Sequence, residues 1–483
     1  MNKKMVFYML GRIILLEGVL LVLPATCSLI YREESFWAFL ITIGIALICG
    51  GTLTLINRTK NNTIFAKEGF VIVALAWISL SAIGALPFVL GNEIPSFTDA
   101  FFETVSGFTT TGASIIPDVE ACSKGMLFWR SFTHWVGGMG VLVLFMAIFP
   151  TESGRTIHIM RAEMPGPIIG KLVPKIKSTA KILYIIYIAL TLTEIALLLF
   201  GGMSFYQSVI YSMGTAGTGG FVIDANGLAD YTAYQQWVIT IFMLIFGVNF
   251  NIYYLILMRK IRSAFKSEEL WSYILIVAVA VAIITGNIYS IYGNLSDSLR
   301  NSAFQVASII STTGYASADF NLWPNTSKAV LLLLMFIGAC AGSTAGGFKV
   351  SRVVIVFKSI KAKLREMLHT RSVSSISFEG KTLDNGTISH VLSYLAIYCF
   401  CIAIIFIVIS LEPFSLETNI SAVVACFNNI GPGLDKVGPM SNFSAYSDFS
   451  KYVLSFAMLL GRLEIYPLIL LFSPSVWKSR SVK

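Results

Sequence analysis

Long apolar runs recur along almost the whole of this 483-residue sequence. A helix needs roughly 20 apolar residues to cross about 30 Å of hydrocarbon. Runs that approach or exceed this length cover residues 7–31, 36–56, 70–90, 126–150, 182–200, 237–258, 270–292, 329–357, 391–411 and 452–472. Only 13% of the residues are charged and 55% are hydrophobic, which leaves too little polar surface to coat a soluble globule. The sequence therefore predicts an all-α integral membrane protein with ten spans.

Basic residues gather in alternate loops between these runs. Because Lys and Arg in short loops remain on the cytoplasmic side, these loops are predicted to face the cytoplasm. They contain Arg58, Lys60, Lys67, Arg155, Arg161, Lys171, Lys175, Lys177, Arg259, Lys260, Arg262, Lys266, Lys358, Lys361, Lys363, Arg365, Arg371, Lys478, Arg480 and Lys483. Both termini are therefore expected in the cytoplasm. The net charge of +9 reflects these inner loops rather than a nucleic-acid surface.

Four predicted outer loops contain a short, semi-apolar stretch that ends in a glycine-centred turn. The stretches, residues 96–108, 203–213, 298–310 and 415–427, are too short to cross a membrane. The turns contain Thr110, Thr111 and Gly112; Gly217, Thr218 and Gly219; Thr312, Thr313 and Gly314; and Asn429, Ile430 and Gly431. Their similar spacing along the chain predicts a repeat made of a helix, a short helix, a turn and a second helix.

Irregular backbone is tolerated at membrane depth only where protein buries it or water lines it. Four turns that face one another around an axis meet this condition, and glycine permits the positive φ angles needed to aim carbonyl groups inward. A ring of carbonyls can replace the hydration shell of a cation, and the negative C-terminal ends of the short helices favour cations. One such turn is equally well explained as an ordinary loop, but four at matching positions predict an ion filter.

Two further features lie within predicted spans. The run 329–357 contains a glycine-rich segment, 338–347, which is either a continuous helix with glycines packed against a neighbour or an unwound loop. The hydroxyl groups inside it and Lys349 directly after it favour the loop. Arg462 lies within the last span, where a lone cation costs about 3 kcal/mol. Arg462 either forms a salt bridge, for instance with Glu464, or faces the pore.

Other distinctive motifs occupy residues 68–70, 84–88, 134–140, 162–167, 338–349, 428–434 and 461–464. With these motifs and the four turns, the chain resembles the Trk/Ktr/HKT superfamily of potassium transporters over essentially its whole length, and most of all the bacterial TrkH branch. The two helices before Lys67 favour that branch, because KtrB-like members lack them. One departure is His369 followed by Thr370, where the family pattern leads us to expect His-Pro.

The resemblance implies four M1-P-M2 repeats (helix, pore helix and filter, helix) around a pseudo-fourfold pore, after two extra N-terminal transmembrane helices. The corresponding divisions are residues 1–60, 61–160, 161–262, 263–366 and 367–483. It also implies a homodimer in the bacterial plasma membrane, a cytoplasmic TrkA-like nucleotide-binding regulatory subunit, and potassium as the transported ion. The expected gate comprises Gly342, Ser343, Thr344, Ala345, Gly346, Gly347, Lys349 and Arg462. No GxGxxG motif follows a predicted strand, so we expect dinucleotide binding in a partner and no organic cofactor in this chain. The seven cysteines show no metal-ligand pattern and the basic residues lie in the inner loops, so we expect no metal besides potassium and no nucleic-acid partner.

Two other functional classes are weighed against this hypothesis. An intramembrane enzyme needs convergent nucleophile, base or metal ligands, and the four histidines, His134, His158, His369 and His390, are scattered; we therefore expect no enzyme. A sodium- or proton-coupled secondary transporter of a cation uses broken helices near the midplane, which the interrupted run fits but four filter-like turns do not. Because the positions two before each glycine are Thr110, Gly217, Thr312 and Asn429, the hydroxyl ring is incomplete and only moderate potassium selectivity is predicted.

Overall fold

The computed structural model describes residues 1–58, 66–140, 176–369 and 375–477, and within these ranges the chain is mainly helical. The strands β1 (Ser377–Phe378) and β2 (Lys381–Thr382) form one antiparallel hairpin. The motif at 162–167, His158, Lys60, Arg371 and the basic residues 155–175 and 478–483 lie outside the described residues. The predicted span 126–150 is described only up to residue 140.

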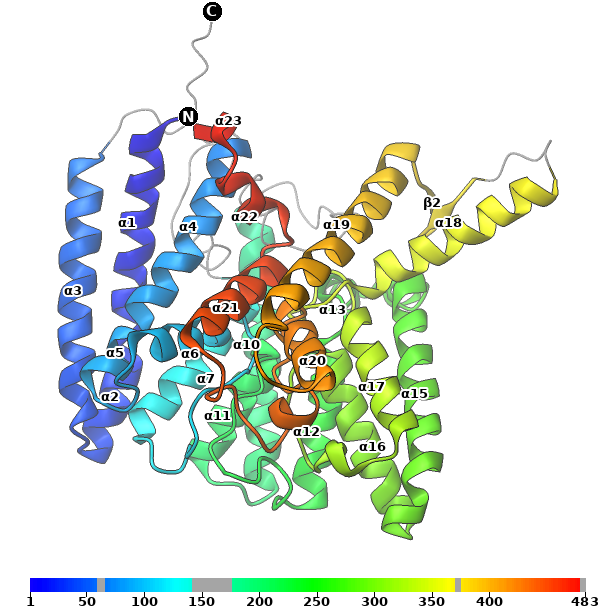
Figure 1. The fold of residues 1–483 in the computed structure, drawn as a ribbon, viewed down its shortest axis with the longest axis horizontal. Helices are drawn as coiled ribbons and strands as arrows, with labels where there is room; N and C mark the ends of the chain where they lie inside the picture. The colour runs from blue at the N-terminus through cyan, green and yellow to red at the C-terminus, as the bar shows by residue number, and fades with distance from the viewer. Residues whose placement is uncertain (59–65, 141–175, 370–374, 478–483) are drawn as a thin grey trace, which may run out of the picture.

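Two N-terminal spans, made of the helices α1 to α3, precede the repeats and form one side of the molecule (Figure 1). α1 (Lys3–Leu20) continues after Leu21 into α2 (Val22–Tyr31), and α3 (Ser35–Ile56) returns beside α1. At the contact between α1 and α3, a Cβ added to Gly11 would lie 2.8 Å from the carbonyl oxygen of Gly50, and the reverse holds for Gly50. The two backbones therefore approach closely through small residues, as is common between helices in membranes.

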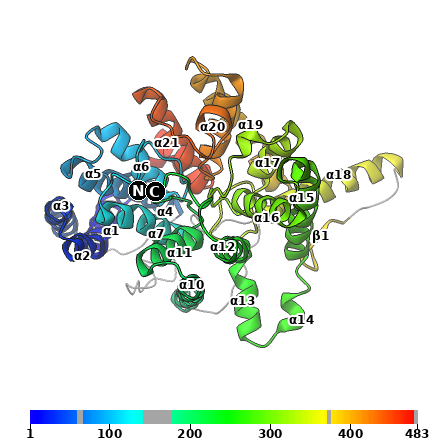
Figure 2. The same ribbon diagram turned by 90° about the horizontal axis from the view of Figure 1, so that it is seen from below.

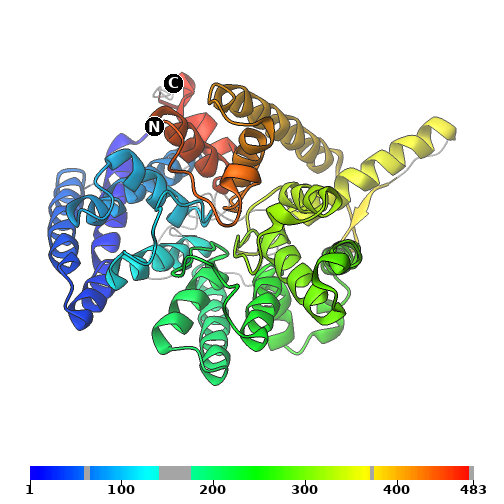
Figure 3. The same cartoon turned by 60° about the horizontal axis from the view of Figure 1, so that its bottom comes forward.

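Four units of similar construction follow, arranged in chain order around a common centre (Figures 2 and 3). The outer helices are α4 (Ala66–Gly84) with α5 (Leu86–Leu90), α10 (Ile176–Phe200), α15 (Glu268–Tyr292) and α19 (Asn385–Ile409). The short pore helices are α6 (Phe97–Phe108), α11 (Phe205–Gly217), α16 (Leu295–Ile310) and α20 (Leu416–Phe427). The inner helices are α7 (Lys124–Gly138), α12 (Ala233–Phe246), α17 (Asn325–Ile337) and α21 (Asp448–Arg462). The predicted fold class is confirmed.

Each pore helix begins at a residue whose side-chain oxygen accepts a hydrogen bond from a backbone N–H in the first helical turn. These N-caps are Ser96, Ser204, Asn294 and Ser415. Such caps satisfy a donor that the helix itself cannot, and they define where each short helix starts. The predicted bounds are close, except that the second pore helix continues to Gly217 rather than ending at residue 213.

The second, third and fourth inner helices are broken, whereas the sequence predicts ten spans of which only the third inner helix is interrupted. Among the described residues, six helices are long and apolar enough to cross a membrane, and a seventh results if α12 and α13 (Phe250–Leu257), bent by 90°, count as one span. Residues 338–349 separate α17 from α18 (Val350–Leu368), and residues 463–465 separate α21 from α22 (Tyr466–Leu471). Of these interruptions, the sequence predicts only the one at residues 338–349, in the third inner helix.

The breaks persist because the freed backbone groups of one repeat bond to those of another. Cys340 N donates to Gly247 O at 3.0 Å, and Phe250 N donates to Gly342 O at 3.1 Å, which joins the bend after α12 to the loop after α17. Buried irregular backbone is stable at membrane depth only with such partners. A pattern confined to one stretch of sequence contains no sign of a partner that lies about ninety residues away in the chain.

The remaining elements lie at the two ends of the molecule. They are α14 (Ile261–Ala264), α23 (Pro474–Trp477) and the short helices η1 (Phe320–Leu322) and η2 (Asp435–Val437). The N-terminus and α23 lie at the same end (Figure 1). Large apolar side chains remain exposed on the outer helices, including Phe200 at 86% and Ile407 at 69% of their surface. Such a surface suits contact with lipid rather than water.

Candidate functional site

The four pore helices end in the same backbone motif. After each helix one residue adopts the left-handed conformation, with φ between 55° and 56°; these residues are Thr110, Thr218, Thr312 and Asn429. The N–H of this residue bonds three positions back, and the next N–H bonds five positions back, as Thr110 N does to Gly107 O and Thr111 N to Ser106 O. This is the Schellman arrangement, which usually requires glycine. Three threonines here accept a conformation that costs about 1–2 kcal/mol each.

The turns then meet one another in a closed cycle. Two residues after each left-handed residue comes a glycine with φ between 79° and 99°, and a Cβ added to it would lie within 2.7 Å of a carbonyl oxygen in the next turn. The pairs are Gly112 with Gly219 O, Gly220 with Thr313 O, Gly314 with Ile430 O, and Gly431 with Thr111 O. The four carbonyl oxygens therefore belong to equivalent positions, and the contacts run from the first turn to the fourth and back to the first.

This cycle corrects the register that the sequence predicts for the second turn. Gly220, not Gly219, has the positive φ angle and contacts the neighbouring carbonyl, and Thr218, not Gly217, is equivalent to Thr110. A Cβ on Gly219 would instead strike the ring of His134, so Gly219 is small for packing reasons. The turn contains three glycines, Gly217, Gly219 and Gly220, and only the contacts between turns show which one is equivalent to the glycines of the other turns.

The corrected register also changes the side chains at the inner ring, where three threonines and one asparagine now lie. Thr312 Oγ1 accepts a hydrogen bond from Gly346 N at 2.7 Å, and Thr218 Oγ1 donates to Gly217 O at 2.6 Å. Asn429 Nδ2 donates to Thr111 Oγ1 at 3.0 Å. Among the described residues Thr110 Oγ1 has no hydrogen-bond partner. The ring is thus richer in hydroxyl groups than predicted, although most of them are engaged by protein.

A cavity of about 240 Å³ opens on one side of the cycle of turns. It is lined by all four positive-φ glycines, Gly112, Gly220, Gly314 and Gly431, and therefore forms a vestibule that leads directly to them. Its wall also includes Arg130 and Asp224. Because it touches all four turns, an ion in the vestibule has access to the whole ring of carbonyls.

A buried ion pair beside the vestibule is a feature that the sequence reasoning missed. Arg130 Nε lies 2.8 Å from Glu103 Oε1, and the two side chains are at most 2% exposed. Glu103 Oε2 accepts from Ile115 N at 2.9 Å, and Arg130 donates to Val222 O at 3.2 Å. The pair therefore braces the segments that follow the first and second filter turns. The sequence signal was the presence of one charged residue in the interior of each of the two helices, Glu103 in α6 and Arg130 in α7.

Below the filter, residues 338–349 form the unwound loop that the sequence favours over a continuous helix, so the predicted interruption is confirmed. Gly338, Gly342, Gly347 and Lys349 all have positive φ angles. The loop closes at its base, where Lys349 N donates to Ile337 O at 2.8 Å and Phe348 N to Phe336 O at 3.3 Å. Its far end reaches the filter, since a Cβ on Gly346 would lie 2.3 Å from Asn428 O.

Arg462 lies beside this loop and joins three repeats. Its guanidinium group donates to Thr344 O at 2.8 Å in the loop and to Gly137 O at 2.5 Å and Gly138 O at 2.8 Å, at the end of α7. The salt bridge to Glu464 that the sequence leaves open is not formed; Glu464 pairs with Arg352. The positive charge of Arg462 is thus stabilised by backbone carbonyl groups. Those at the C-terminal end of α7 have no partner within the helix and carry a partial negative charge.

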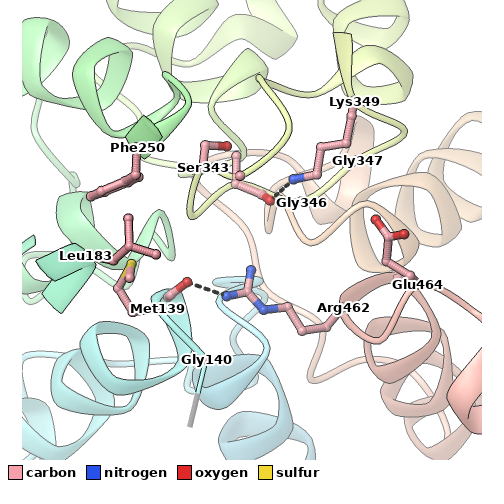
Figure 4. Close-up of a pocket in the computed structure, with 14 residues that line it drawn as sticks. Met139, Gly140, Leu183, Phe250, Ser343, Gly346, Gly347, Lys349, Arg462 and Glu464 are labelled. Carbon is pink, nitrogen blue, oxygen red and sulfur yellow. Dashed lines mark hydrogen bonds between the residues drawn. The ribbon is translucent and has the colours of Figure 1, made fainter. Parts of the chain in front are cut away.

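A small cavity of about 50 Å³ separates the loop from α7 and α21. Figure 4 shows the Arg462 side chain entering it from one side and Lys349 from the other. Lys349, which is 2% exposed, donates to Ala345 O within the same loop. The predicted gate residues from Gly342 to Gly347, Lys349 and Arg462 are therefore brought together in space, directly below the filter turns.

Comparison with known proteins gives a consistent result. Residues 37–479 match the family model of TrkH, described as a cation transport protein. The chain is 35% identical to the Trk system potassium uptake protein TrkH of Salmonella typhimurium and 34% identical to that of Escherichia coli, covering 99% of this chain and 100% of each relative. The crystal structure of the potassium transporter TrkH from Vibrio parahaemolyticus superimposes with a TM-score of 0.89 at 30% identity, over 99% of this chain and 100% of that one.

Proposed function

The chain belongs to the TrkH family of cation transport proteins, and we propose that potassium crosses the membrane through the ring of four filter turns and is held back below it by the intramembrane loop and Arg462. The chain is a Trk-system potassium uptake protein of the membrane, and a transporter rather than an enzyme. The finer proposal concerns the path of the ion and the residues that control it.

The cycle of contacts between the four turns is the observation that supports the filter. Carbonyl oxygens of Thr111, Gly219, Thr313 and Ile430 occupy equivalent positions, each beside the glycine of the preceding turn. Such a ring can exchange for the water around a desolvated potassium ion. The pore helices end at these turns, so their partial negative charge favours a cation there. The proposed filter therefore contains the predicted residues of the first, third and fourth turns, and Thr218, Gly219 and Gly220 in the second turn in place of Gly217, Thr218 and Gly219.

The proposed gate rests on how Arg462 is held. Its guanidinium group binds carbonyls of the third repeat's loop and of the first repeat's inner helix, so it crosses the space between repeats below the filter. A fixed positive charge at close range in a low-dielectric bore raises the energy of a passing cation. The loop is closed at its own base, so it can move without unfolding α17 or α18. Moving the loop and Arg462 apart would open the path.

The assembly and orientation belong to the same proposal. We place both termini in the cytoplasm and the vestibule outside, because the basic residues of the sequence fall in alternate loops between the predicted spans and at its two ends. We assign the repeats to residues 61–160, 161–262, 263–366 and 367–483, after the N-terminal pair in 1–60. A homodimer in the bacterial inner membrane, with a TrkA-like regulatory subunit on its cytoplasmic side, would complete the system.

A sodium- or proton-coupled secondary transporter of a cation is the second candidate, because the second, third and fourth inner helices are broken and broken helices hold ions in such transporters. The two candidates differ in their energetics. A filter conducts labelled rubidium down its own gradient in proteoliposomes that have no sodium or proton gradient, whereas a coupled transporter requires one. Sodium added as a competitor reports the selectivity in the same assay.

The gate is tested by Arg462→Ala and by deletion of residues 343–345. Each should raise rubidium flux in the absence of any partner, because each removes contacts that hold the loop against α7. Lys363→Ala is the matched control, since Lys363 is an exposed cation that pairs with Glu366 on the same helix. If both gate variants insert stably and conduct at the wild-type rate, the barrier lies elsewhere in the pore.

A further inference from the structure

Glu269 is a buried carboxylate that the filter and the gate described above do not use. It is the second residue of α15 and only 4% exposed. Its Oε1 atom accepts a hydrogen bond from Ala341 N at 2.7 Å and another from Ser351 N at 3.1 Å. These two residues lie on either side of the loop segment 342–347. One side chain, from a helix that is not part of the loop, therefore holds both ends of it.

The local backbone explains why an acceptor is needed at this point. Ser351 is in the first turn of α18, whose N-cap Lys349 provides no side-chain acceptor. The first N–H groups of a helix have no partner within the helix and are stabilised by negative charge. Glu269 supplies this acceptor from outside the helix, because its Oε1 atom accepts from both Ser351 N and Ala341 N. Without it, the start of α18 and the entry to the loop lose their common anchor.

Glu269 is also tied to the surface hairpin formed by β1 and β2. Glu379, an exposed residue in the turn of that hairpin, accepts hydrogen bonds through Oε1 from Glu269 N at 3.0 Å and from Ser267 Oγ at 2.8 Å. The hairpin itself is seated on α18, because Phe378 packs in one apolar cluster with Ile355. Figure 1 shows the hairpin beside α18, away from the cycle of turns. A short chain of contacts therefore leads from this surface to the loop.

We propose that Glu269 is a positioning residue that holds the intramembrane loop in its closed arrangement, and that the β1–β2 hairpin controls the loop through Glu379 and Glu269. The inference rests on the proposed role of the loop as a gate. Displacing the hairpin withdraws Glu379 from the start of α15, which shifts Glu269 and releases both ends of the loop together. A cytoplasmic partner that pulls on the hairpin can thus open the gate without touching it.

The test measures rubidium uptake by the full chain in proteoliposomes without any partner. Glu269→Leu keeps the bulk of the side chain but removes its acceptors, and we expect basal uptake to rise roughly tenfold. Glu269→Gln retains an oxygen that can accept both bonds and should remain within about twofold of wild type. Lys363→Ala again serves as the control, because Lys363 is exposed and pairs with Glu366 on its own helix rather than with the loop or the hairpin.

Two additional variants make every outcome decisive. Glu379→Ala changes an exposed residue and should raise uptake about threefold, and combining it with Glu269→Leu should add nothing, because both act through one contact chain. If Glu269→Leu does not insert, Glu379→Ala alone decides. Wild-type uptake in Glu379→Ala, or an equal rise in the leucine and glutamine variants, overturns the inference. If Arg462→Ala raises uptake but Glu269→Leu does not, the proposed gate is supported and only the role of Glu269 is refuted. If neither variant raises uptake, the proposed gate is refuted as well.

Discussion

Replacing Gly220 by alanine tests the geometry of the filter most directly. Gly220 has a φ angle of 79°, and its added Cβ would lie 1.9 Å from the carbonyl oxygen of Thr313. Ordinary contact at such a site begins at 3.4 Å, so the carbonyl must move by about 1.5 Å, the difference between the two distances. The alanine also bears about 1–2 kcal/mol of backbone strain from its left-handed conformation. Only the movement of the carbonyl, and not the strain, alters the ring.

Gly202→Ala separates these two effects. Gly202 has a φ angle of 80°, but nothing lies within 4 Å of its added Cβ, so the same strain arises without displacing any carbonyl. In proteoliposomes, rubidium uptake measured at increasing sodium concentrations gives the preference of each variant for rubidium over sodium. We expect Gly220→Ala to lose about fivefold in preference, which corresponds to about 1 kcal/mol of lost differential coordination, and Gly202→Ala to match wild type. Equal selectivity in all three proteins would refute the assignment of Gly220 and Thr313 to the filter.

Other measurements address the rest of the pore. Because no turn has the full Thr-Val-Gly-Tyr-Gly sequence, bi-ionic potentials should show only a moderate preference for potassium over sodium, and a ratio equal to that of tetrameric potassium channels would contradict this. Arg130→Met leaves Glu103 buried and unpaired, and should lower the thermal midpoint of the purified protein, reflecting about 3–5 kcal/mol, far more than an exposed Arg→Met change. Hydroxyl donors from Ser415 and Thr418 lower the pKa of Asp435. Its contribution to stability should therefore be complete above the ordinary carboxyl pKa of about 3.9 and disappear as external pH falls further, while Asp435→Asn should abolish this pH dependence in thermal scans.

Much of the architecture depends on properties of short stretches, which is why it could be predicted. Apolar length predicts the membrane-spanning helices, and the recurrence of short stretches before glycine turns predicts four pore helices. The interrupted third inner helix is visible for the same reason, since glycines and hydroxyl groups are concentrated between residues 338 and 347. The placement of Lys349 and Arg462 near this loop also agrees with the structure, because both charges needed protein partners within the membrane.

Tertiary contacts decided the features that no short stretch encodes. The second filter turn offers several glycines, and only the carbonyl of Thr313 from the next repeat selects Gly220 over Gly219. The bend between α12 and α13 is stabilised by backbone groups of the distant loop, so it has no local signature. Tertiary contacts also determine the partners of the buried charges. Arg462 binds backbone carbonyl groups, whereas Glu464 pairs with Arg352. Composition predicts that a buried charge or a freed backbone group needs a partner, but only the packing of distant segments determines which partner comes within hydrogen-bonding distance.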